Sequence, residues 1–135
     1  IVMNISLIRN YLISRNEIMM AFLFGSVAAD SAGSESDIDI AVYFEPPNGI
    51  IEWESQTRYP AEDQIWFDVE RLTGREVDLL VLNRAPVTIV DTVLREGKPL
   101  IIRNRRVYLD LLLRTSREAE DYRDFIEDFW KIKYA

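Results

Sequence analysis

Three short apolar runs, set between segments of helical periodicity, constrain the fold of this chain more than any other feature. They are residues 18–24 (IMMAFLF), 37–44 (DIDIAVYF) and 76–82 (EVDLLVL). Runs of this length are typical of strands rather than of helices, and their nearly continuous apolar character is typical of strands covered on both faces. The sequence therefore predicts a sheet packed against helices.

Helical periodicity is present in the segments between these runs. Residues 5–13 and 61–73 place apolar side chains three and four positions apart, and Gly74 stands where a helix-ending glycine is expected. A short helix is predicted from Pro86 to Glu96, followed by a fourth strand over 99–103 at a sheet edge, where proline is tolerated. With a possible helical turn over 27–33, the order of elements indicates an α/β (α+β) fold with helices on a sheet.

The last segment, residues 104–135, has the composition of helix. Residues 115–118 (TSRE) match a capping box, which leaves open whether this segment is one helix or two. An apolar stripe at helical spacing fits either core packing or a partner-binding face; it consists of Tyr122, Phe125, Ile126, Phe129 and Trp130.

The composition excludes several kinds of site. The 135 residues, the length of one domain, include no cysteine and no histidine. Disulfides, thiolate nucleophiles, cysteine-based metal centres and histidine bases are therefore ruled out. Catalysis would depend on carboxylates, hydroxyls, Lys, Arg or Tyr, and a metal bound among oxygens would be Mg²⁺, Mn²⁺ or Ca²⁺.

The charge is unevenly distributed along the chain. The net charge is -7; residues 1–102 hold 16 acidic and 8 basic side chains, whereas residues 103–135 hold 7 and 8. An acidic body argues against direct binding of nucleic acid and fits either a basic protein partner or a role in solubility. The small basic cluster at Arg103, Arg105 and Arg106 fits a phosphate contact or a helix end. No run of about 18 apolar residues and no signal-peptide pattern is present, so we expect a cytoplasmic protein without a membrane segment.

Two aspartates alternate with isoleucines at the start of the second apolar run. Asp37 and Asp39 would lie on one face of a strand, with Ile38 and Ile40 on the other. Asp78 repeats this anomaly in the third run. Like charges on one face repel, and a divalent cation between them removes the conflict. If the two strands are neighbours, the three carboxylates form an oxygen site for one or two Mg²⁺ ions; the competing interpretation is a solvated strand end.

The first apolar run ends in Gly25-Ser26. Glycine lets a phosphate approach the backbone, and serine offers a hydroxyl beside the free N–H groups of a helix start. An ordinary turn has the same composition. The phosphate-binding interpretation gains weight because the aspartate pair begins the next strand, ten residues after Ser26.

Gly25-Ser26, a gap of ten residues and Asp37-Ile38-Asp39 together resemble the signature of the nucleotidyltransferase superfamily that includes DNA polymerase β. Residues 77–86 (VDLLVLNRAP), followed by Arg95-Glu96-Gly97, resemble its minimal nucleotidyltransferase (MNT) branch. The resemblance spans about residues 18–103. It implies a short mixed sheet flanked by helices, with a nucleotidyltransferase domain over 1–103 and a helical segment over 104–135 packed on it or on a partner.

The resemblance also implies site residues and a function. Asp37, Asp39 and Asp78 would bind two Mg²⁺ ions, Asp78 would act as general base, and Gly25 and Ser26 would hold the triphosphate of ATP. Members of the MNT branch serve as antitoxins that transfer AMP onto a tyrosine of a HEPN-type RNase toxin, in a hetero-oligomeric complex. Two alternatives remain: an antitoxin that acts by binding alone, and a transferase for a small hydroxyl compound such as an aminoglycoside. Ala29-Asp30, in place of the Arg-Gly that relatives often carry, favours the first alternative.

Overall fold

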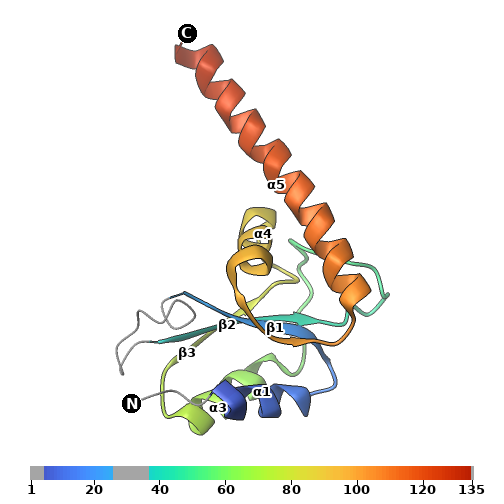
Figure 1. The fold of residues 1–135 in the computed structure, drawn as a ribbon, viewed down its shortest axis with the longest axis vertical. Coiled ribbons are helices and arrows are strands. Elements are labelled where there is room, and N and C mark those ends of the chain that lie inside the picture. The colour runs from blue at the N-terminus through green and yellow to red at the C-terminus, as the bar shows by residue number, and fades with distance from the viewer. Residues whose placement is uncertain (1–4, 26–36, 135) are drawn as a thin grey trace.

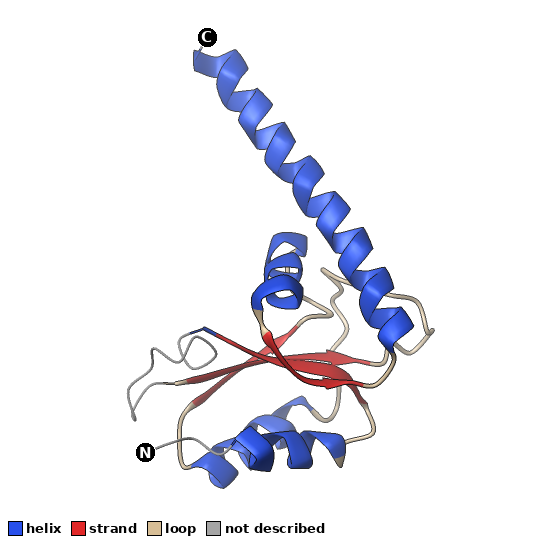
Figure 2. Cartoon of the chain, viewed as in Figure 1, coloured by secondary structure: helices blue, strands red, loops and turns tan. Residues whose placement is uncertain are grey.

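A four-stranded sheet lies between two layers of helices in the computed structural model, which describes residues 5–25 and 37–134 (Figure 1). Helices α1 and α3 cover one face, and α4 with the first part of α5 covers the other (Figure 2). The elements are α1 (Ile5–Ile13), β1 (Ile18–Phe24), β2 (Ile38–Phe44), α3 (Glu62–Thr73), β3 (Val77–Val81), α4 (Val87–Glu96), β4 (Lys98–Ile102) and α5 (Arg105–Tyr134).

The strand order is β3-β2-β1-β4. The β1 strand is antiparallel to both of its neighbours, whereas β2 and β3 are parallel. This arrangement confirms the short mixed sheet, and it confirms β4 as an edge strand. The predicted neighbourhood of the two aspartate-bearing strands is also confirmed, because β2 and β3 pair directly.

Alternation along the strands divides the core into two clusters. On β2, the buried Ile38, Ile40 and Val42 face α1 and α3, whereas Ala41 and Tyr43 face α4 and α5. These side chains are fully buried, which explains why the apolar runs are nearly continuous.

Arg103, the first of the three clustered arginines, donates hydrogen bonds at the C-terminal end of α1. The Arg103 guanidinium follows β4 and donates to the carbonyl oxygens of Ile13 at 2.6 Å and Ile18 at 2.7 Å. It also reaches the carbonyl of Arg15 at 3.2 Å. A cation here satisfies carbonyls that the end of α1 leaves without helical partners. The helix-end interpretation is therefore confirmed for Arg103.

The C-terminal segment is one continuous helix of 30 residues, about 45 Å long at the usual rise per residue. The two-helix alternative is wrong. Thr115, the first residue of the apparent capping box, is buried, and its hydroxyl donates to the Leu111 carbonyl one turn earlier at 2.8 Å. Because the hydroxyl is satisfied inside the helix, it starts no new one.

Only the first part of α5 packs on the body of the protein (Figure 1). The buried Asp91 of α4 accepts from Arg95 at 2.8 Å and from Arg123 of α5 at 3.2 Å. Beyond Arg123 the helix projects, and Phe125 and Trp130 are 65% and 47% exposed. Within the described residues, most of the apolar stripe therefore does not pack into the core. No helix in the described part of the chain is both long and apolar enough to cross a bilayer.

Candidate active site

Asp39 and Asp78 lie opposite each other at one end of the β2–β3 pair. The two residues are register partners in this parallel pairing. Their side chains therefore lie on the same face of the sheet, the face that α4 covers further along the strands. Asp39 is partly buried and Asp78 is exposed.

The surroundings of Asp39 make it costly for this residue to carry a charge. Burial raises the pKa of Asp39 above its ordinary value, and the hydrogen bond to Asp78 and the negative charges of Asp78 and Asp37 raise it further. Two carboxyl groups this close need either a shared proton or a cation. Their oxygens are donors that Mg²⁺ prefers, so the pair fits a divalent metal ion.

Asp37 is an exposed residue just before the first residue of β2. Its charge acts on Asp39. Within residues 5–25 and 37–134, however, no three acidic side chains are grouped closely enough to form a ready metal site. The structure thus places two of the predicted ligands opposite each other on paired strands, and the third, Asp37, two residues before Asp39.

Gly25 occupies the position that faces Asp39 from β1. It follows Phe24, whose register partner in β2 is Asp39. Its φ of 73° lies in the left-handed region, and a Cβ atom built on it would stand 2.2 Å from Asp39 Oδ2. Only glycine fits here without displacing the carboxylate. Ser26, the other predicted phosphate-binding residue, lies outside the described residues.

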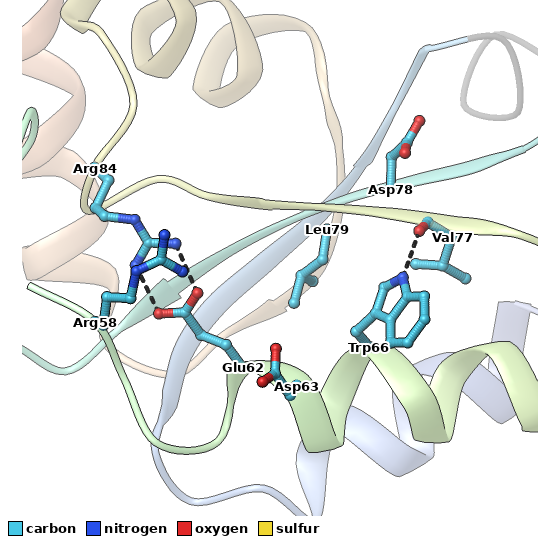
Figure 3. A pocket seen from close by; sticks show the side chains of 8 residues that line it. All are labelled: Arg58, Glu62, Asp63, Trp66, Val77, Asp78, Leu79 and Arg84. Carbon is cyan, nitrogen blue, oxygen red and sulfur yellow. Dashed lines mark hydrogen bonds and ion pairs between the residues drawn. The ribbon is translucent and has the colours of Figure 1, made fainter.

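A pocket of about 470 Å³ lies along the outer edge of β3. Its lining includes Asp78, but Figure 3 shows the Asp78 carboxylate on the opposite side of β3 from Trp66 and Glu62. The pocket therefore borders the carboxylate pair without containing it. The rest of its lining is Arg58, Asp63, Val77, Leu79 and Arg84.

Sequence reasoning missed the side chains that secure β3 at this edge. Trp66 Nε1 donates to the Val77 carbonyl at 2.9 Å, and Glu70 accepts from the Val77 N–H at 3.0 Å. The Glu62 carboxylate binds both terminal nitrogens of Arg84 at 2.6 Å (Figure 3). Trp66 is one of the helically spaced apolar residues of 61–73, but nothing in a helical pattern indicates which strand edge a helix will cover.

A four-stranded mixed sheet flanked by helices, with paired aspartates at one end, is the architecture of the nucleotidyltransferases. The family model described as "Polymerase beta, Nucleotidyltransferase" matches residues 7–106, and the chain belongs to this family. The matched range includes Gly25, Asp37, Asp39 and Asp78. No match was found among curated protein sequences.

Solved structures resemble the chain over nearly its whole length. One is the crystal structure of a toxin–antitoxin with AMP-PNP, at 20% identity and a TM-score of 0.73, covering 98% of this chain and 99% of that one. Another is the tri-AMPylated Shewanella oneidensis HEPN toxin in complex with MNT antitoxin, at 18% identity and a TM-score of 0.67, covering 98% and 100%. A third is the toxin–antitoxin MntA-HepT, at 18% and 0.66, covering 96% and 99%. At these identities the likeness is one of fold.

Proposed function

We propose that this protein is the antitoxin of a two-component pair, and that it transfers AMP from ATP onto a tyrosine of a HEPN-type RNase toxin and so neutralises it. The observation that carries the proposal is the pairing of Asp39 with Asp78 on one face of two adjacent parallel strands, beside a glycine that leaves room for the Asp39 carboxylate. Membership of the nucleotidyltransferase family supports the reaction. Likeness in fold to an MNT antitoxin bound to an AMPylated toxin supports the acceptor.

The reaction is an in-line displacement at the α-phosphorus of ATP. The tyrosine oxygen forms a bond to this phosphorus while the bond to the pyrophosphate oxygen breaks, and pyrophosphate leaves. In our proposal the proton of the tyrosine hydroxyl passes to the Asp78 carboxylate, which is exposed and therefore accessible to an acceptor. The backbone at Gly25, together with Ser26, holds the triphosphate.

Asp37, Asp39 and Asp78 would hold the magnesium ions, two by analogy with other phosphoryl-transfer sites. When bound, these ions stabilise negative charge on the attacking and leaving oxygens. The proposed reaction requires neither histidine nor cysteine, in agreement with the composition of the chain.

The test is a transfer assay with ATP labelled at the α-phosphate, Mg²⁺ and the product of the neighbouring gene, which the proposal expects to be a HEPN-type toxin. We expect label on the toxin, loss of its RNase activity, and a fall in transfer of roughly 100-fold or more for the Asp37→Asn, Asp39→Asn variant. Asp63→Asn is the matched control, because it removes an exposed acid from α3. Omission of Mg²⁺ is expected to abolish transfer.

Two results contradict the proposal. Neutralisation of the toxin without label transfer would indicate an antitoxin that acts by contact alone. Label on a small alcohol such as an aminoglycoside, with none on the toxin, would indicate a small-molecule transferase.

A further inference from the structure

The projecting part of α5 carries a wide apolar face that no other helix or strand in the described part of the chain covers; within α5 itself, the Lys133 ammonium lies over the rings of Phe129 and Trp130. We define the apolar face of α5 by its six members: Tyr122, Phe125, Ile126, Phe129, Trp130 and Ile132. At about 100° per residue they lie within an arc of about 160° around the helix. Phe125 and Ile132 are 65% and 82% exposed. The acidic residues of this stretch lie on the remaining part of the circumference.

This face continues the stripe that packs α5 on the body. Leu111, Thr115 and Ala119 are buried on that stripe, and at helical spacing they point in the same direction as Tyr122 and Ile126. The apolar pattern thus continues unchanged past Ala119. What changes there is that the body of the protein no longer covers the helix. The body of the protein covers the first half of the stripe, whereas the side chains of the second half are largely exposed among the described residues.

The exposed area is large enough to form an interface. Four aromatic side chains and an isoleucine, each about half or more exposed, present roughly 500 Å² of apolar surface. A single helix without tertiary contacts is only marginally stable in water. A partner that covers this face would therefore both bury apolar area and stabilise the helix.

The width of the face identifies the shape of the partner. A second copy pairing through the same helix would cover Tyr122, Phe125, Phe129 and Ile132, which follow the 3-4-3 spacing of a two-stranded seam. That contact would leave Trp130 in water. A groove between two helices covers the whole arc. Asp121 and Asp128 lie along one edge of the face, so basic side chains on the rim of such a groove would complement them.

We infer that the apolar face of α5 docks into a groove between two helices of the toxin, with Lys or Arg of the toxin beside Asp121 and Asp128. This inference rests on the proposed function. The fold likeness to the solved toxin–antitoxin chains extends over 94–98% of this chain, so α5 belongs to the shared architecture.

The docking surface and the carboxylate pair lie on the same side of the sheet. The α5 helix leaves the body on the side of α4, away from α1 and α3 (Figure 1), and Asp39 and Asp78 share that face. A toxin held by α5 is therefore kept on the side where transfer takes place. Docking raises the local concentration of the acceptor without taking part in the chemistry.

The test compares Phe125→Asp, Phe129→Asp with the control Asp124→Ala, Glu127→Ala, whose two exposed residues lie on the opposite side of α5. We expect the aspartate variant to lose roughly 100-fold or more in affinity for the HEPN-type protein by calorimetry. The KM for the toxin in label transfer rises accordingly, while kcat at saturating toxin and Mg·ATP binding by the variant change little. The control binds as wild type. Circular dichroism verifies that both variants keep their fold.

Three results would overturn the inference: unchanged affinity of the aspartate variant, a wild-type chain that does not bind the toxin, or a homodimer of the wild type that the same variant dissociates. The proposed function is tested separately. A wild type that binds through this face and transfers no label contradicts the transfer of AMP and supports the docking surface. Asp37→Asn, Asp39→Asn is expected to bind the toxin normally and to transfer no label.

Discussion

At the scale of single residues, the position of the Asp39 carboxylate depends on the absence of a side chain at Gly25. The φ of 73° at Gly25 already favours glycine. A Cβ atom at this position would stand 2.2 Å from Asp39 Oδ2, so any other residue would displace the carboxylate. The sequence motif had suggested that glycine serves phosphate approach. The structure adds a second reason, because Gly25 makes room for a carboxyl group of the same site.

We predict that Gly25→Ala reduces label transfer much more than it reduces stability. The left-handed conformation costs about 1–2 kcal/mol for a residue with a Cβ atom, while the displaced Asp39 carboxylate disturbs the site itself. Gly74→Ala is the matched control: its φ is 66°, and a Cβ atom there would meet nothing within 4 Å. Urea unfolding and the transfer assay are the two measurements. Similar loss of transfer in both variants would contradict the role of Gly25.

At the scale of elements, the outer edge of strand β3 has no neighbouring strand in the sheet, and side chains of helix α3 and of the residues after β3 hold it in place. The Glu62–Arg84 pair connects the start of α3 to the residues that follow β3. Burial alone would raise the pKa of Glu62, but the Arg84 guanidinium and the Tyr59 N–H outweigh it and lower this pKa below its ordinary value. The ionised carboxylate therefore stabilises the fold.

The stabilisation by Glu62 should depend on pH in a definite direction. Since the folded state has the lower pKa, the contribution is fully present above the ordinary pKa near 4.5 and is lost as the pH falls through the folded value. We expect Glu62→Gln to lower the free energy of unfolding by about 1–2 kcal/mol at pH 7 and by less at pH 3. Chemical denaturation of both proteins across this range measures the difference. A difference that stays constant with pH would contradict the assignment.

Most of the elements could be predicted from the sequence because their patterns are local. The strand over 18–24, the helix over 5–13 and the helix end at Gly74 agree with the structure. The pairing of β2 with β3 was a condition of the predicted metal site, and the register of Asp39 with Asp78 meets it. The roles of Asp37, Asp39, Asp78 and Gly25 in catalysis and binding stay predictions.

The predictions that failed or stayed open depend on distant contacts. The TSRE sequence has the composition of a helix start, but Thr115 is buried and its hydroxyl donates to a carbonyl within the same helix. Likewise, an apolar stripe has the same spacing whether the covering surface comes from the same chain or from another. The two interpretations, core packing and partner binding, can be distinguished only once the structure shows that the packing of α5 on the body ends near Arg123.

At the scale of the whole molecule, the buried Asp91 fixes the direction in which α5 leaves the body. Its carboxylate is almost fully buried and binds guanidinium groups from both α4 and α5, whereas those arginines are themselves largely exposed. A buried acid with two cationic partners tolerates little movement of either helix.

We expect Asp91→Asn to destabilise the protein by about 1–2 kcal/mol, because the partial exposure of both arginines moderates the larger cost of a fully buried pair. Hydrogen exchange should also become faster in the first half of α5. Asp110→Asn, which breaks the exposed pair with Arg114, is the control and should cost less than about 0.5 kcal/mol. Equal effects of the two substitutions would show that Asp91 does not fix α5.

The projecting half of α5 also has a consequence for the lifetime of the protein. Phe125 and Phe129 are exposed on this half of the helix, and we expect a helix without tertiary cover to open locally and to be cleaved by proteases there. Covering the helix closes these cleavage sites. The protein would then be degraded faster when its partner is absent than when it is bound. The amount of free protein would therefore depend on degradation as well as on synthesis.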